Sequence, residues 1–280
     1  MSHLSWDLGG ITLHRIAYLD VGVDGRQLFS VDVEQAPEWT AAWQVDGQVG
    51  LGLAFHVIES GDEVLVVDPV GAVDPFIRSG APAIDHQRAA FEALSTAGVD
   101  RDAVTQVVLT HLDGIGMTAW ATLVGDDHLT WGPAFTNARI VLSAAEHRHI
   151  AEHDDIPGRE VFDLLDGAGH VDAVDDPIDL APGVRARLTG GHSPGHLALD
   201  LDGSDRTATL VGHLAVTPFH VLDATNAGQH VDDAAGAAAQ ADELARAMRD
   251  GRLVGGSLWP APGYGTVTSV DPIEIAPAAT

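Results

Sequence analysis

The stretch LTHLDGIGM (residues 109–117) is a part of this sequence that could do chemistry. A short apolar run leads into Thr110 and His111, and Asp113 follows just before the first of two glycines. Metal hydrolases often place ligands where a strand ends in a tight loop, and imidazole and carboxylate groups are both ligands of zinc. The chain has no cysteine, so any metal must be held by histidine, aspartate or glutamate. One histidine and one aspartate are too few, so a working site needs further ligands from elsewhere in the chain.

The composition excludes several classes of partner. The chain has 280 residues with 41 acidic and 14 basic ones, a formal net charge of −27, and every basic residue is arginine. Such a surface repels nucleic acid and anionic membranes, and it fits a soluble protein or a salty habitat. The N-terminus lacks the basic and apolar segments of a signal peptide, and no apolar run approaches the length of a membrane span. We therefore expect a cytoplasmic protein with a small-molecule substrate or ligand, and homodimerisation stays open.

The elements that must position these residues form two similar halves. The pattern predicts a hairpin over 53–68 that turns at Ser60-Gly61-Asp62, and then a helix over 83–99. Ser143 and Glu146 predict a capping box at the start of another helix. Strands and a long alanine-rich helix follow again in the second half. Two rounds of strands and helices predict an α/β fold, a four-layer αββα sandwich of two mixed β-sheets. We expect one domain over 1–280 with a frayed tail at 271–280.

Four stretches resemble, in order, the metallo-β-lactamase superfamily, and specifically its lactonase-like hydrolases. They correspond to that family's first metal loop, third-histidine loop, bridging-aspartate strand end and C-terminal histidine loop. The four are VVLTHLDGIGM (107–117), LTGGHSPGHLALDL (188–201), TLVGHLAVTPFHV (209–221) and LVGGSLWPAPGYGTV (253–267). The resemblance covers a core of about residues 50–267 and keeps its order throughout, which supports the αββα fold.

The same resemblance implies that the metal site is degenerate. The family's two metal ions need five histidines and two aspartates. Here the bridging aspartate is replaced by His213 and the final histidine by Leu258. If the first loop carries a two-residue deletion, His111 and Asp113 keep their places and Gly114 replaces a histidine. A gapless match, which also stays open, would put His111 at the second histidine. Under either alignment the dinuclear site is not intact.

The positions that keep a functional group are His111, Asp113, His192 and His213. The resemblance implies that they converge, and three neutral imidazoles are a sufficient set for one catalytic zinc with an open fourth position. The alternative is a pocket without metal, in which the same side chains act as acid–base or polarising groups. We therefore expect either no cofactor or one divalent metal, with zinc as the first choice.

The resemblance also places several aromatic groups around the family's cleft. We expect them to form an apolar substrate pocket. They are Trp120, Phe219, His220, Trp259 and Tyr264. In the same comparison His196 and Asp68 are structural. On the helix after Ser143, His149 and His153 lack the glutamate of an H-E-x-x-H zinc motif and are predicted to lie on a solvated face.

Two functions are consistent with this sequence. The first is a divergent enzyme that acts on a small, fairly apolar ester, lactone or related metabolite by hydrolysis or acid–base chemistry. The second is a non-catalytic relative that binds a small molecule or a protein through the same cleft. Function must be decided at the site, because one fold hosts many chemistries.

Overall fold

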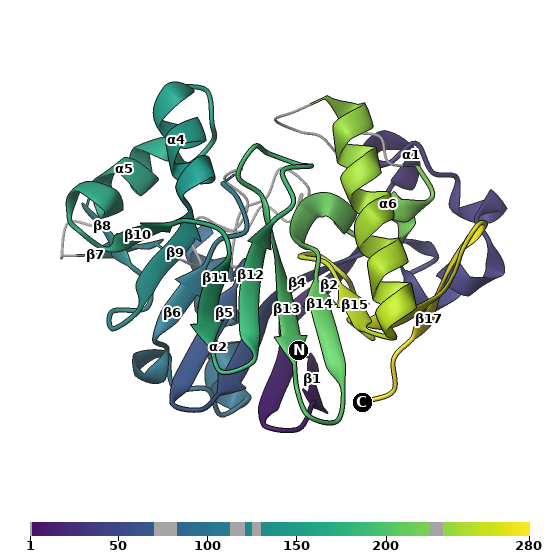
Figure 1. Ribbon diagram of the computed structural model, residues 1–280, viewed down its shortest axis with the longest axis horizontal. Helices are drawn as coiled ribbons and strands as arrows, with labels where there is room; N and C mark the ends of the chain where they lie inside the picture. The colour runs from purple at the N-terminus through teal and green to yellow at the C-terminus, as the bar shows by residue number, and fades with distance from the viewer. Residues whose placement is uncertain (1, 70–82, 113–120, 125–129, 224–231) are drawn as a thin grey trace.

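The protein folds into two mixed β-sheets that pack face to face, with helices on the outer faces (Figure 1). The computed structural model describes all residues except 1, 70–82, 113–120, 125–129 and 224–231. The predicted four-layer αββα sandwich is confirmed. The prediction that 1–280 form one domain stays a prediction.

The first sheet contains eight strands, and the second contains seven. The strands of the first sheet, in spatial order, are β1 (Ser2–Asp7), β2 (Ile11–Val23), β4 (Gln48–Ser60), β5 (Glu63–Val67), β6 (Gln106–Val108), β9 (Arg139–Ser143) and β10 (Val171–Val174), with β3 (Gln44–Val45) beside β4. The second sheet runs in order through β11 (Ile178–Ala181), β12 (Val184–Leu188), β13 (Leu197–Asp202), β14 (Thr207–Leu210), β15 (Leu253–Gly255), β16 (Gly265–Val270) and β17 (Ile273–Pro277). A separate pair is formed by β7 (Ala121–Val124) and β8 (Thr130–Pro133).

The helices connect and cover these strands. The α-helices are α1 (Gly25–Leu28), α2 (Ala83–Thr96), α4 (Ala144–Glu152), α5 (Arg159–Gly167) and α6 (Asp233–Asp250). Short 3₁₀ helices are η1 (Val33–Gln35), η2 (Glu38–Trp43), η3 (Arg101–Ala103), η4 (Gly212–Ala215) and η5 (Pro218–Val221). In the part of the chain that the structure describes, no helix is long and apolar enough to span a membrane.

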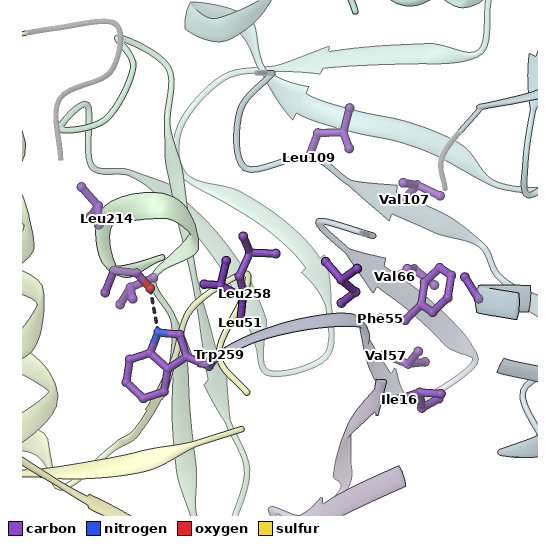
Figure 2. Packing of buried hydrophobic residues seen from close by; sticks show 14 of the residues in the cluster. Ile16, Leu51, Phe55, Val57, Val66, Val107, Leu109, Leu214, Leu258 and Trp259 are labelled. Atoms are coloured by element: carbon purple, nitrogen blue, oxygen red, sulfur yellow. Dashed lines mark hydrogen bonds between the residues drawn. The ribbon is translucent and has the colours of Figure 1, made fainter. Parts of the chain in front are cut away.

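Alternating side chains along the strands divide the interior into two cores. Along β5, Leu65 and Val67 face the second sheet, whereas Val66 faces the helices. Figure 2 shows part of the helix-side core, where Val66 lies near Phe55 and Val57. Successive side chains of a strand point to opposite faces, so a strand covered on both sides must be apolar at nearly every position.

The local predictions from the first half of the sequence are confirmed. Strands β4 and β5 pair in antiparallel register with Ser60 opposite Glu63, and Gly61 at the turn has a φ of +62°. That backbone conformation favours glycine. The predicted helix over 83–99 corresponds to α2.

The C-terminal tail differs from the expected frayed end. Residues Ile273–Pro277 form β17, which pairs along β16, and the backbone N–H of Ala278 donates to the Tyr264 carbonyl. Trp6 also donates from its indole Nε1 to the carbonyl of Ala279. The short sequence IEIAP shows strand alternation over too few residues to predict a strand, and the pairing partner supplies the rest. The prediction of a frayed tail was wrong.

Helix α6 is fixed to the second sheet by ion pairs, and it in turn holds η4. Arg187 on β12 donates from Nε to Asp200 at 2.8 Å and from Nη1 to Glu243 of α6 at 2.6 Å. Arg246 pairs with Asp200 from the helix side. One turn earlier on α6, the amide of Gln240 donates to the carbonyl of Leu214 in η4. The position of η4 therefore depends on the position of α6 against the second sheet.

His56 connects β4 of the first sheet with the loop before β16 of the second. Its Nε2 lies 3.3 Å from the Ser257 carbonyl, which can only accept, and its Nδ1 lies 2.7 Å from the Tyr264 hydroxyl. The imidazole thus carries its proton on Nε2 and accepts from the tyrosine. Burial, together with the charge of Arg15, lowers the pKa of His56 to about 4.

We predict that stability falls with acidity through His56. An unfolded histidine binds a proton near its usual pKa of about 6.5, whereas the folded one stays neutral down to about pH 4. The unfolded state therefore binds more protons in this window. The stabilisation is complete above pH 6.5 and is lost progressively as the pH falls to about 4, a difference of about 3 kcal/mol. We expect the free energy of unfolding, measured by chemical denaturation between pH 4 and 7, to change less with pH for His56→Gln than for the native protein.

The matched control is His170→Gln, because His170 is half-buried and lies away from this junction. It should leave the pH dependence unchanged. Equal slopes for the native protein and the His56 variant would contradict the prediction.

Candidate metal centre

Three histidines from loops of both sheets meet in one buried cluster. His111 follows β6, His192 lies between β12 and β13, and His213 is on η4 after β14. One ring nitrogen from each lies within 4.8 Å of the others. The three side chains are 6%, 2% and 3% exposed, respectively. The structure thus brings together three of the four predicted ligands, whereas Asp113 lies outside the described residues.

His111 is oriented by the residue before it. The Thr110 hydroxyl lies 2.6 Å from Oδ2 of Asp68 and 3.1 Å from Nδ1 of His111. The single hydroxyl proton goes to the carboxylate, the stronger acceptor, so Nδ1–H of His111 must be the donor to the threonine oxygen. Its Nε2 then carries the lone pair. Asp68 also accepts from the Thr110 backbone N–H at 2.8 Å and from the Ser257 hydroxyl at 2.9 Å, so the predicted structural role of Asp68 is consistent with its contacts.

His213 is held from behind by His196. The backbone N–H of His213 donates to Nε2 of His196, and Nδ1 of His196 lies 2.7 Å from the Thr189 hydroxyl. That hydroxyl also donates to the His196 carbonyl, so it accepts from Nδ1–H of the ring. Both ring nitrogens of His196 are thereby used in supporting contacts. This agrees with the predicted structural role of His196.

Gly212 permits this close packing. Its φ is +55°, and a Cβ atom there would lie 2.5 Å from Nε2 of His196. Any larger residue would have to displace the ring that fixes His213. The positive φ and the close approach of His196 both favour glycine at position 212, directly before His213.

The predicted capping box at α4 is half formed. The Ser143 hydroxyl caps the helix by accepting from the Glu146 backbone N–H at 2.9 Å. The Glu146 carboxylate, however, does not return to Ser143. It accepts from the backbone N–H of Leu112 at 3.0 Å and from the Ser193 hydroxyl at 2.5 Å. This part of the prediction was wrong, because the loops of His111 and His192 offer donors that compete with the helix end.

The position that the sequence resemblance assigns to the family's final histidine, Leu258, is apolar and buried. Leu258 is 2% exposed and lies with Leu51 near Trp259 (Figure 2). Its backbone bridges two segments, since its N–H donates to the Val216 carbonyl and its carbonyl accepts from Gly52. A leucine side chain offers no ligand, so this position contributes nothing to a second cation. Gly114, the other lost position, lies outside the described residues.

The residues predicted to form a substrate pocket are packed in the interior. Phe219, His220, Trp259 and Tyr264 are each at most 1% exposed. Nδ1 of His220 accepts from the backbone N–H of Val216, and Nε1 of Trp259 donates to the Ala215 carbonyl at 2.7 Å (Figure 2). Trp120 lies outside the described residues. That these groups form a substrate pocket stays a prediction.

The histidines of α4 do not assemble a second cluster. Nδ1 of His153 contacts the His149 carbonyl at 2.8 Å, and His147 pairs with Asp166 across to α5. Within the described ranges, the one group of three or more metal-ligating side chains is His111, His192 and His213.

Sequence reasoning predicted structural roles for His196 and Asp68 but missed two other groups that support the histidines, Thr110 and Glu146. Thr110 stands directly before His111, so a polar residue there could have been recognised as a supporting group. Glu146 was assigned to the helix cap, and nothing local in the sequence marks its contact with residues almost 50 positions away.

Comparison with known proteins identifies the fold. No family model matches the sequence, and no curated protein matches it. Among solved structures, a hydrolase of the β-lactamase superfamily, AbOPH, has a TM-score of 0.77 at 14% identity and covers 99% of this chain and 98% of its own. AidC, a dizinc quorum-quenching lactonase solved with the product N-hexanoyl-L-homoserine, has a TM-score of 0.74 at 14% identity over 99% of this chain and 98% of its own.

A probable metal-dependent hydrolase from Staphylococcus aureus gives a TM-score of 0.70 at 16% identity, and it covers 98% of this chain and 99% of its own. These matches span nearly the whole chain on both sides. The predicted resemblance is confirmed at the level of the fold, and the strands before residue 50 belong to the matched region.

We predict that Thr110→Val destabilises the protein by about 1–3 kcal/mol. The substitution keeps the shape of the side chain but removes one donor to Asp68 and the acceptor for His111 in a fully buried position. The free energy of unfolding from chemical denaturation measures the loss. Thr268→Val makes the same change at an exposed position of β16 and should alter it by less than about 0.5 kcal/mol. Equal effects of the two variants would show that the Thr110 hydroxyl has no special role.

Proposed function

We propose that this protein, with its metallo-β-lactamase fold, is a hydrolase that uses one divalent cation, zinc being the first choice. His111, His192 and His213 would hold the ion. The observation that carries this proposal is the convergence of three buried imidazoles from three separate loops, with a ring nitrogen of each within 4.8 Å of the others. Catalytic zinc sites use three protein ligands and leave a fourth position open.

The protonation pattern of the cluster fits this role. A zinc ligand must offer a lone pair, and the contact of Nδ1 with Thr110 leaves the lone pair of His111 on Nε2. The hydrogen bond from that Nδ1–H toward a hydroxyl backed by a carboxylate is the arrangement that fixes ring orientation and raises basicity in metal-bound histidines. Three neutral imidazoles also suit a soft-to-borderline cation better than magnesium or calcium, which prefer oxygen ligands.

Each part of the site has a separate task. A bound zinc ion would supply Lewis acidity at the carbonyl oxygen of a substrate. Asp68 and Thr110 keep the proton of His111 on Nδ1, facing away from the cluster. His196 fixes the backbone of His213. Because the cluster is buried, competing water is limited and electrostatic effects there are strengthened.

The substrate class that we propose is a small, fairly apolar ester or lactone. Two considerations support it. One similar structure, AidC, is described as a lactonase with an acyl-homoserine product. In this chain the position that the resemblance assigns to the family's final histidine is taken by the apolar Leu258, so the site has one polar group fewer there. Asp113 stays a proposed fourth functional group, and the pocket residues proposed are His220, Trp120, Phe219, Trp259 and Tyr264.

The second candidate is a binding protein without catalysis. Leu258 is the observation that favours it, because loss of a ligand position is expected when chemistry is no longer selected. In that case the same cleft would take a small molecule or a protein segment without metal. Metal content separates the two candidates directly.

We predict that the purified protein binds at most one equivalent of zinc, iron or manganese. Leu258 removes a ligand of the second cation, and His213 replaces a bridging carboxylate by a neutral group. Elemental analysis of protein prepared without chelator measures the stoichiometry. His213→Ala should abolish tight binding, whereas His147→Ala, on α4 and paired with Asp166, should leave it unchanged. Two tightly bound equivalents at this cluster would contradict the proposal.

We also predict that Leu258→His does not by itself create a second tight metal site or raise activity on lactones. A second cation would still lack the carboxylate that His213 has replaced. His213→Asp in the native background should lower turnover, because it replaces one of the three imidazoles around the first cation by a carboxylate. Turnover of short acyl esters and lactones, with and without added zinc, measures both effects. A metal-dependent increase in either single variant would show that the site remains built for two metals.

A further inference from the structure

Glu146 is a buried carboxylate between the loops that carry two of the three histidines. Its side chain is 0% exposed. Oε1 accepts from the backbone N–H of Leu112, the residue that directly follows His111. Oε2 accepts from the hydroxyl of Ser193, the residue that directly follows His192. One carboxylate therefore contacts both loops, at the position next to each histidine.

The loop of His192 is packed tightly against the start of α4. Oε2 of Glu146 also accepts from the backbone N–H of Gly195 at 3.2 Å, and the Ser143 hydroxyl donates to the Gly195 carbonyl at 2.7 Å. A Cβ atom on Gly195 would lie 2.0 Å from the backbone nitrogen of Glu146. No side chain could be accommodated there without displacing the helix. The start of helix α4 thus fixes the position of the loop His192-Ser193-Pro194-Gly195.

The two loops belong to different sheets. His111 follows β6 of the first sheet, and His192 precedes β13 of the second. One direct bond runs from the backbone N–H of Leu197 to the carbonyl of Thr110 at 2.9 Å. On the first loop this bond and the contact of Glu146 flank His111, at Thr110 and Leu112. On the second loop both links follow His192, with Glu146 at Ser193 and the direct bond at Leu197. The two loops are thus joined at two places.

We propose that Glu146 is a positioning residue that sets the separation of the His111 and His192 imidazoles and thereby tunes the affinity of the cluster for its cation. The inference rests on the proposed function for its metal-binding part. The claim that Glu146 sets the separation of the two imidazoles applies to the zinc-free protein as well. Partners behind metal ligands typically contribute a factor of about 10–100 to metal affinity.

Glu146→Gln is the sharpest test of this role. The amide has nearly the shape of the carboxylate, but one of its two terminal groups is a donor. All three partners of Glu146 are donors, so at least one contact must be lost. Ser193→Ala removes one of these contacts from the opposite side. Because both variants alter the same hydrogen-bonded unit, their effects should not be additive, and the double variant should lose less affinity than the two single losses combined.

Two measurements are made on each variant. The zinc dissociation constant is obtained by competition with a chromophoric chelator. The imidazole ¹H–¹⁵N resonances of the zinc-free protein report the environments of His111 and His192. Glu63→Gln is the matched control, because Glu63 also accepts two side-chain hydrogen bonds, from Thr105 and Gln106, but lies at the start of β5, at the opposite end of the strand from Asp68. It should lower the thermal stability and leave both measurements unchanged.

We expect Glu146→Gln to weaken zinc binding by about 10–100-fold and to shift the resonances of His111 and His192, with those of the remote His3 unchanged. A folded Glu146→Gln variant with native affinity and native resonances would overturn the inference. If Glu146→Gln does not fold, the same two measurements on Ser193→Ala decide it. Absence of zinc binding by the native protein would refute the proposed function, and the zinc-free resonances would then decide whether Glu146 positions the rings.

Discussion

The arrangement of the site depends on satisfying buried polar groups where the two sheets meet. Three imidazoles and the backbone of three loops are withdrawn from water at this junction, and an unpaired polar group there would cost about 1–3 kcal/mol. Asp68 and Glu146 supply the acceptors. Asp68 takes two donors from Thr110 and one from Ser257, and Glu146 takes donors from both histidine loops. Each carboxylate ties segments that are more than 30 residues apart, so the loops can be irregular and yet fixed.

The layered fold could be predicted from the sequence because its signals are local. Apolar runs such as LVV in β5 indicate strands covered on both faces, and Ser60-Gly61-Asp62 indicates the turn between β4 and β5. The C-terminal strand β17 could not be predicted in the same way. Its five residues are short and weakly patterned, and they become a strand through the register with β16. A local sequence pattern does not show which strand the complete fold brings alongside as a pairing partner.

The histidine cluster was predictable for a different reason, since it depended on the order of motifs. His111 and His213 follow apolar runs, His192 follows Thr189-Gly190-Gly191 after β12, and the structure brings the three together. The supporting groups behind them were not predictable to the same degree. A serine followed three residues later by glutamate fits a capping box, and the sequence does not show that Ser193 competes for the same carboxylate. Such a choice is decided by the donors that the tertiary fold brings to the carboxylate, here the Leu112 backbone N–H and the Ser193 hydroxyl.

The two replacements that the sequence resemblance implies, at His213 and Leu258, are consistent with each other in terms of charge under the proposed one-metal function. Two divalent cations close together require anionic ligands between and around them, and replacing the bridging aspartate by imidazole removes one such charge. A second cation would then be held with less negative charge and, at Leu258, with no ligand at all. One cation among three neutral imidazoles avoids this difficulty. Its charge can be balanced from behind by Asp68 and Glu146, which act through Thr110 and through the two histidine loops without needing to touch the metal. The same two carboxylates that satisfy the buried loops would therefore offset the charge of the single ion that we propose.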